Sequence, residues 1–204
     1  MRSSYIDNDY GSVFRSLILA QQPKLVVECG VLDGYSTFNI AHAIRFNRQR
    51  RGIICPFFAY DLWEDYDYKH GDFQEVEDML KKQQLDRFVN LTEGDAFNVA
   101  QVFENGEVDF LHMDISNDGD TLVKTLEVWG DKISESGMIA FEGGSIDRDN
   151  VDWMQKYDFT SIRDTLINHP SVYKNWIYQI LDVFPSMTLL WHLNNHFQYQ
   201  QIQK

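Results

Sequence analysis

The segment that decides the fold is VVECGVLDGYST, residues Val26–Thr37. An apolar run leads into an acid at Glu28, glycines follow at Gly30 and Gly34, and an amphipathic segment begins near Ser36. This order predicts a buried strand, a glycine turn and the start of a helix. Such a junction places backbone N–H groups and a carboxylate beside one small ligand. The identity of that ligand is therefore the central question about function.

Length and composition predict one folded domain over residues 1–204. Hydrophobic residues make up 44% of the chain and charged residues 24%, which suits a full core and argues against disorder. The net charge of −13 repels phosphate backbones, so we expect no nucleic-acid partner. The N-terminus lacks the apolar core of a signal peptide, and no apolar run is long enough to cross a bilayer. We expect a cytoplasmic protein without a membrane partner; a homo-oligomer is left open.

The cysteines and the basic residues point to structure rather than to function. Cys29 and Cys55 fall in predicted buried strands, and no C-x-x-C pattern indicates zinc, so both are interpreted as small hydrophobes. Four arginines gather where the first long helix should end, where cations favour the helix dipole: Arg45, Arg48, Arg50 and Arg51. We interpret them as a solvated helix end rather than as a binding patch.

Short apolar strands alternate with helical patterns, which is typical of parallel strands joined by crossover helices. The expected strands are 25–29, 53–60 (or only its part after Pro56), 89–91, 108–113 and 138–141. The expected helices are 9–21, one capped by Ser36, 73–84, 97–103, 121–129 and 161–168. Two apolar runs, 176–184 and 187–193, flank a Pro-Ser turn and predict an antiparallel hairpin. The fold class is α/β: a mostly parallel seven-stranded sheet with a C-terminal antiparallel hairpin and helices on both faces.

Acids lie at or near the ends of the five predicted parallel strands: Glu28, Asp61, Asp95, Asp114 and Glu142. In an open parallel sheet, ligands bind outside the carboxyl ends of the strands. Any one of these acids can be a turn or helix cap. Several acids at one edge concentrate negative charge, which costs stability unless it is used. The set is therefore the strongest evidence for a site.

The strand-end residues favour an adenosine ligand. Asp61 follows the second strand, where an acid can accept hydrogen bonds from both ribose hydroxyls. Leu62 and Trp63 offer an apolar face for adenine, and Asp95 with Ala96 can hold the adenine amino group.

The other end of the ligand faces Glu28, the glycine turn and Ser36. The turn has no G-x-G-x-x-G pattern, and an acid beside it disfavours a pyrophosphate, so an NAD-linked dehydrogenase is the least supported enzyme. An amino-acid tail fits better, because its ammonium can approach the acids and its carboxylate can meet the helix N-terminus.

With these motifs in order, the sequence resembles the class I S-adenosylmethionine-dependent methyltransferases. The matching segments are VVECGVLDGYST, FFAYDLW for the ribose, EGDAF for the adenine, VDFLHMDISNDGDTLVKTLEVW for the fourth motif and SGMIAFEGG for strand five. It is most similar to the small-molecule O-methyltransferase branch with the macrocin-type and cephalosporin-hydroxylase-like proteins. The resemblance implies a Rossmann-like fold, S-adenosylmethionine as cofactor and methyl transfer to a hydroxyl of a small molecule such as a sugar or natural product.

The resemblance also implies a divalent metal, held in that branch by the strand-four Asp and by acids after strand five. Asp114 matches the first, and Glu142 is the only acid at the second, because Gly143 and Gly144 follow it. Mg²⁺ on Asp114 and Glu142 is therefore the predicted metal site, and the glycines leave metal dependence open.

Methyl transfer to oxygen is an in-line displacement in which the protein aligns the reactants and can remove the hydroxyl proton. The candidate bases are Asp114, Glu142 and His112, although a lone strand histidine is more often a core residue. Two alternatives stay open: a non-catalytic S-adenosylmethionine-binding module, and a hydroxylase-like enzyme on the same fold.

Overall fold

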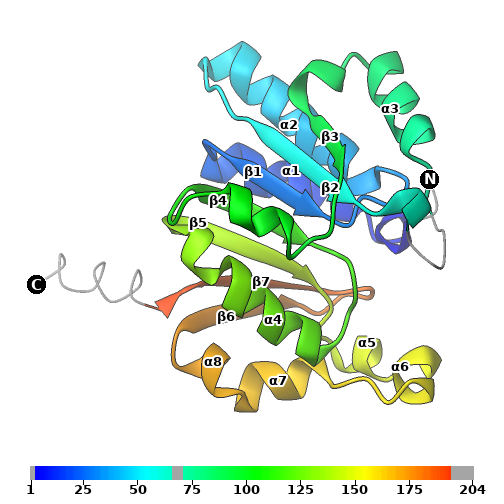
Figure 1. Ribbon diagram of the computed structural model, residues 1–204, viewed down its shortest axis with the longest axis vertical. Coiled ribbons are helices and arrows are strands. Elements are labelled where there is room, and N and C mark those ends of the chain that lie inside the picture. The colour runs from blue at the N-terminus through cyan, green and yellow to red at the C-terminus, as the bar shows by residue number, and fades with distance from the viewer. Residues whose placement is uncertain (1–2, 66–70, 194–204) are drawn as a thin grey trace, which may run out of the picture. The chain divides into compact units, whose positions relative to one another are not determined.

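The computed structural model describes residues 3–65 and 71–193 (Figure 1). Its strands are β1 (Val26–Cys29), β2 (Phe57–Asp61), β3 (Asn90–Glu93), β4 (Val108–Met113), β5 (Ile133–Glu142), β6 (Trp176–Leu181) and β7 (Met187–His192). Its α-helices are α1 (Tyr10–Gln21), α2 (Tyr35–Arg51), α3 (Phe73–Lys82), α4 (Gly119–Trp129), α5 (Ile146–Asp149), α6 (Asp152–Lys156), α7 (Ile162–Asn168) and α8 (Pro170–Tyr173). Single 3-10 turns are Ser4–Ile6, Trp63–Asp65, Asp86–Phe88, Val99–Val102 and Gly130–Lys132.

The strands belong to a seven-stranded sheet in the order β3-β2-β1-β4-β5-β7-β6. The sheet is mostly parallel and ends in an antiparallel hairpin, so the predicted fold class is confirmed. The chain divides into two compact units, residues 1–99 and 100–204, which are described separately below. The prediction of a single domain over residues 1–204 stays a prediction. In the part of the chain that the structure describes, no helix has both the length and the apolar character needed to cross a membrane.

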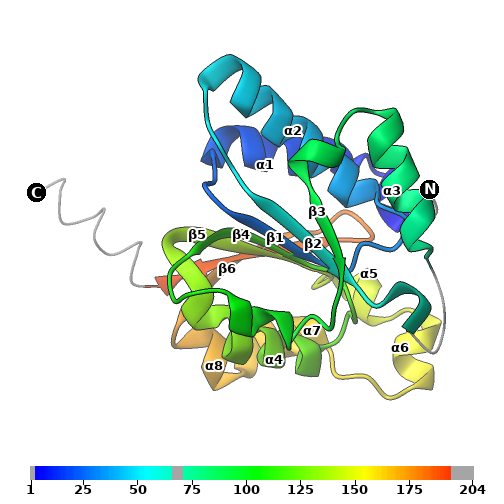
Figure 2. The same ribbon diagram turned by 45° about the horizontal axis from the view of Figure 1, so that its top comes forward.

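Unit 1 consists of the parallel strands β3-β2-β1 with α1, α2 and α3. Helices α1 and α2 run side by side in both Figure 1 and Figure 2. Their contact is apolar at Phe14, Ile18 and Ile40, which are buried, and Asn47 Nδ2 donates across it to the Ile18 carbonyl at 3.0 Å. Burial of this face holds the helix that follows the glycine turn in a fixed position.

The start of β2, the burial of Cys55 and the start of α2 are settled by the structure of unit 1. Strand β2 begins at Phe57, after Pro56, because proline has no N–H to give to a ladder. Cys55 therefore lies outside the strand and is only half-buried, so its prediction as a core residue was wrong, whereas Cys29 is buried in β1. Helix α2 begins at Tyr35 with Gly34 as its N-cap, so Ser36 lies inside the first turn and does not cap it.

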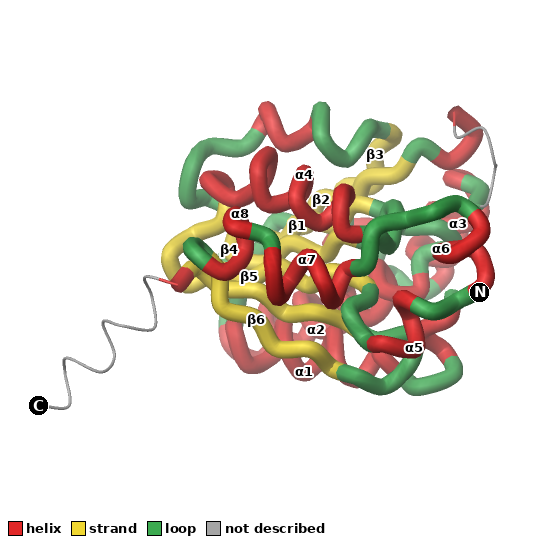
Figure 3. The backbone as a smooth tube through the Cα atoms, turned by 90° about the horizontal axis from the view of Figure 1, so that it is seen from below, coloured by secondary structure: helices red, strands yellow, loops and turns green. Residues whose placement is uncertain are grey.

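Unit 2 consists of the parallel pair β4 and β5 and the antiparallel run β5-β7-β6. Helices α4, α7 and α8 lie next to one another along these strands (Figure 3). The register pairs Met113 with Phe141, so Asp114 and Glu142 come at equivalent positions at the ends of neighbouring strands. The short helices α5, α6 and α8 were not predicted, because four or five residues are too few for a helical period to be recognised.

Candidate functional site

Asp61 holds the glycine turn of unit 1. Its Oδ2 accepts hydrogen bonds from the N–H groups of Val31 (2.7 Å) and Leu32 (2.8 Å). Its Oδ1 accepts from the N–H groups of Leu62 (2.7 Å) and Trp63 (3.2 Å). A carboxylate has about four acceptor positions, so the protein's own backbone uses all of them here. Asp61 lies at the predicted strand end, and its observed contacts order the turn between β1 and α2.

Glu28 is a fully buried acid within β1, just before that turn. The hydroxyl of Thr37, in the first turn of α2, donates to its Oε2. A buried carboxylate is costly without such partners. The contact therefore joins the strand to the helix across the glycine turn, and Thr37 is a residue that the sequence analysis did not single out.

The N-terminus of α2 faces the turn without a side-chain cap. Gly34, its N-cap, has φ of +81°, and a Cβ there would lie 3.0 Å from Val76 and Met79 of α3. Only glycine meets both conditions without strain. The first-turn N–H groups of α2 and the positive end of its dipole are thus available to an anionic group such as a carboxylate.

Asp95 and Ala96 follow β3. Asp95 Oδ1 accepts from the N–H groups of Phe97 (3.1 Å) and Asn98 (2.9 Å), so the acid also acts as a turn cap. The Ala96 carbonyl lies 4.0 Å from the Cys29 sulfur.

The pKa of the Cys29 thiol indicates a negative electrostatic potential at the end of β1. Burial raises its pKa well above the usual value, and the nearby charges of Glu28, Asp95 and Asp61 raise it further. Three predicted site acids thus act on one buried atom. Negative potential there favours a ligand with a positive charge.

Trp63 is placed differently from its predicted role. Only 1% of it is exposed, and its ring meets Phe73 edge-on at 5.0 Å between centroids. In this structure it presents no open face to an adenine ring; Leu62 beside it is half-buried. The Trp63 Nε1 is buried and has no hydrogen-bond partner among the described residues.

In unit 2, the predicted acceptor-side residues have unequal access. His112 is fully buried within β4, and Glu142 is 4% exposed at the end of β5. Asp114, directly after β4, is half-buried.

Glu142 is paired with an arginine that sequence reasoning missed. Its Oε1 lies 3.6 Å from Nε of Arg148, and both side chains are buried. Its Oε2 accepts from the amide of Asn117. The guanidinium of Arg148 lies over the ring of Trp153, 4.5 Å from the centroid. We call Asn117, Glu142, Arg148 and Trp153 the arginine cluster.

These contacts do not fit a metal at Asp114 and Glu142. Both oxygens of Glu142 already have partners, and one of those partners is a permanent cation. Within residues 3–65 and 71–193, no three His, Cys, Asp or Glu side chains form a group that could hold a metal ion.

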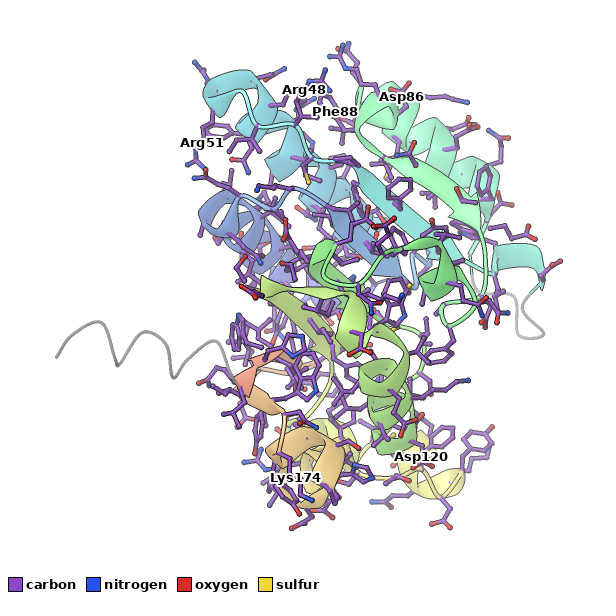
Figure 4. The ribbon with its side chains drawn as sticks, turned by 60° about the vertical axis from the view of Figure 1, so that its left-hand side comes forward. Arg48, Arg51, Asp86, Phe88, Asp120 and Lys174 are labelled. Carbon is purple, nitrogen blue, oxygen red and sulfur yellow. The ribbon has the colours of Figure 1, made fainter. Side chains whose placement is uncertain are left out.

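The arginines at the end of α2 lie away from the turn, at the opposite end of the helix. Arg48, Arg50 and Arg51 are exposed, as predicted for a solvated helix end. A hollow of about 480 Å³ lies there, lined by Arg48, Gln49, Arg87 and Phe88. Figure 4 shows Arg48 beside Phe88, and Arg51 further along the helix end.

With this geometry established, comparison with known proteins identifies the family. Residues 27–142, more than half of the chain, match the family model described as a methyltransferase domain. The chain belongs to this methyltransferase family. The matched segment begins inside β1 and ends on Glu142, so it includes all five strand-end acids. No curated protein matches this sequence.

Solved structures share the fold of this methyltransferase. The S-adenosylhomocysteine-bound methyltransferase from Podospora anserina has a TM-score of 0.64 and 19% identity, covering 89% of this chain and 77% of that one. An O-methyltransferase from Bacillus cereus in complex with S-adenosylhomocysteine has a TM-score of 0.60 and 16% identity, covering 89% and 80%. An O-methyltransferase from Streptomyces achromogenes in complex with S-adenosylmethionine has a TM-score of 0.58 and 11% identity, covering 93% and 86%. These likenesses confirm the predicted Rossmann-like methyltransferase fold.

Proposed function

We propose that this methyltransferase transfers the methyl group of S-adenosylmethionine to a hydroxyl of a small molecule. The observation that carries the donor is the convergence of Glu28, Asp61 and Asp95 on the end of β1, beside the uncapped N-terminus of α2. The donor has a sulfonium and an ammonium, which suit the acids, and a carboxylate, which suits the helix end. Three solved structures of the same fold contain this donor or its product.

The donor residues are those predicted from the sequence, with roles sharpened by their contacts. Asp61 orders the turn that carries Gly30 and Gly34, and ribose hydroxyls would have to share its oxygens with the backbone. Glu28 supplies negative charge from within the core, and Ser36 lies in the uncapped first turn. Asp95, whose Oδ1 caps the turn after β3, is the acceptor we assign to the adenine amino group.

The acceptor side belongs to unit 2. In the reaction, the acceptor oxygen attacks the methyl carbon, the carbon–sulfur bond breaks, S-adenosylhomocysteine leaves, and the hydroxyl proton goes to a base. We assign the base to Asp114, because it is partly exposed while His112 is fully buried and Glu142 is paired with Arg148. Asn117 Oδ1 is buried, has no hydrogen-bond partner within residues 3–65 and 71–193, and can accept a hydrogen bond from the substrate.

The test of the donor is a calorimetric titration with S-adenosylhomocysteine, with and without Mg²⁺. We expect micromolar binding that does not depend on the metal and is lost in Asp61→Ala. Absence of binding under both conditions would overturn the proposal.

The test of the acceptor side is Asp114→Ala, with Asp120→Ala on the exposed face of α4 as the matched control. Turnover on a panel of hydroxylated small molecules should fall in Asp114→Ala while S-adenosylhomocysteine binding is retained. Full activity in that variant would remove Asp114 from the mechanism.

One observation supports an alternative function, a non-catalytic module that binds S-adenosylmethionine. The arginine cluster stands where the resembling branch has metal-holding acids after strand five. Tight donor binding by the wild type without methylation of any acceptor would favour that module. Activity that required iron and an oxidant would instead favour the hydroxylase-like enzyme.

A further inference from the structure

The arginine cluster lies where the family resemblance places a metal. Glu142 ends β5, and its two oxygens contact Arg148 Nε at 3.6 Å and the Asn117 amide. The side chains of Glu142 and Arg148 are 5% and 8% exposed, so water screens this ion pair little.

The two glycines after Glu142 form the turn that leads to Arg148. Gly143 and Gly144 have φ values of +107° and +108°, a backbone conformation that other residues rarely adopt. A Cβ on Gly143 would come within 2.4 Å of Ile162, and one on Gly144 within 2.3 Å of Thr188 Oγ1. An acid or amide at either position would therefore disrupt the turn, so the missing metal ligands and the position of Arg148 have one structural cause.

The guanidinium is held firmly beside Glu142. Ser145 Oγ accepts from the Arg148 backbone N–H at 3.1 Å and caps α5, and the guanidinium lies over the ring of Trp153. A divalent ion at Glu142 would have to displace this buried, permanently charged group or bind next to it. Either arrangement is unfavourable.

We propose that Arg148 takes the place of the divalent cation beside Glu142 and is a positioning residue of a metal-independent acceptor side. The inference deepens the proposed function and rests on it. A fixed guanidinium neutralises Glu142 and orients it and Asn117, which a metal does elsewhere, but it brings no coordinated water and no exchangeable ligand.

The experiment is a titration of the full chain with Mn²⁺, a stand-in for Mg²⁺, followed by electron paramagnetic resonance. The acidic surface will bind some Mn²⁺ weakly, so each protein is compared with its Glu142→Gln partner. Wild type and Glu142→Gln should bind Mn²⁺ equally. Arg148→Met should gain one site, and Arg148→Met with Glu142→Gln should lose it. Arg163→Met, which removes the partly exposed partner of Asp182 at the same 3.6 Å, is the matched control and should gain none.

Two results would overturn the proposal. One is a wild-type Mn²⁺ site that disappears in Glu142→Gln. The other is a folded Arg148→Met, checked by circular dichroism, that gains no site. If Arg148→Met does not fold, the wild-type and Glu142→Gln comparison still decides. A parallel titration of the wild type with S-adenosylhomocysteine distinguishes failure of this proposal from failure of the proposed function. If the wild type does not bind S-adenosylhomocysteine, the methyl-transfer function is overturned, but the Mn²⁺ binding results still stand.

Discussion

The two units stabilise their strand-end acids in different ways. In unit 1, Asp61 accepts hydrogen bonds from four backbone N–H groups, and Glu28 accepts a hydrogen bond from the Thr37 hydroxyl. Neutral partners satisfy these acids without cancelling their charge. In unit 2, Glu142 is neutralised by a buried arginine.

The difference shows that acids at similar positions can serve opposite purposes. Acids solvated by amides and hydroxyls keep a negative potential, which suits a cationic donor. An acid paired with arginine becomes part of a rigid, neutral framework. Substitutions at Arg148, Asp61, Thr37 and Cys29 test this contrast between the two units.

The largest effect is expected when the charge of Arg148 is removed. Arg148→Met leaves Glu142 buried without its cation, so the free energy of unfolding should fall by about 3–5 kcal/mol. Urea denaturation measures the change. Adding Glu142→Gln should restore much of the loss. The control Arg163→Met removes a pair whose side chains are 34% and 67% exposed, so it should cost about 1 kcal/mol or less. If Arg148→Met loses no more stability than Arg163→Met, the Glu142–Arg148 ion pair does not stabilise the fold as proposed.

Removing the carboxylate of Asp61 should affect both stability and donor binding. Asp61→Ala leaves four turn N–H groups without their acceptor, so unfolding should become easier by about 2–4 kcal/mol. Calorimetry should also detect no S-adenosylhomocysteine binding. Asp118→Ala, which removes the cap of α4, should cost about 1 kcal/mol and keep the binding. Normal donor affinity in a folded Asp61→Ala would separate the turn from the donor site.

Thr37 offers a smaller test of the buried acid. Thr37→Val keeps the shape but removes the hydroxyl that donates to Glu28, so stability should fall by about 1–2 kcal/mol in urea denaturation. Thr37→Ser keeps the hydroxyl and should lose less. If valine and serine behave alike, the hydrogen bond contributes nothing measurable.

The smallest effect is a pH dependence from Cys29. Its pKa is raised in the folded state, so above the unfolded pKa of about 8.5 the unfolded chain loses the proton first. The stabilisation is complete below about pH 8 and is lost as pH rises toward the folded pKa, by at most about 1.4 kcal/mol per pH unit. Urea denaturation from pH 7 to 10.5 should show a shallower decline in Cys29→Ala than in wild type. The free energy of unfolding of Cys55→Ala should decline with pH as that of the wild type does. Equal slopes in the wild type and both variants would contradict a negative potential at the end of β1.

Much of the fold could be predicted because it depends on local patterns. The bounds of β4 matched expectation, and α1 began one residue later than expected, because hydrophobic periodicity acts within a few residues. The sequence analysis placed the cap of α2 at Ser36 instead of Gly34. Glycine can adopt the positive φ of this N-cap position, and the helix begins there without a capping hydroxyl. The short helices α5 and α6 carry too little periodicity to be recognised.

The site divides in the same way. The sequence by itself determined which acids end the strands, since each follows an apolar run, and its motifs indicated the methyltransferase family. Only the tertiary structure decided which partner each acid has. Thr37 reaches Glu28 from nine residues away, and Arg148 reaches Glu142 only through the turn at Gly143 and Gly144. Hydrogen bonds and ion pairs depend on distance and direction in space, which residue spacing does not specify, so the state of each carboxylate is a property of the folded chain.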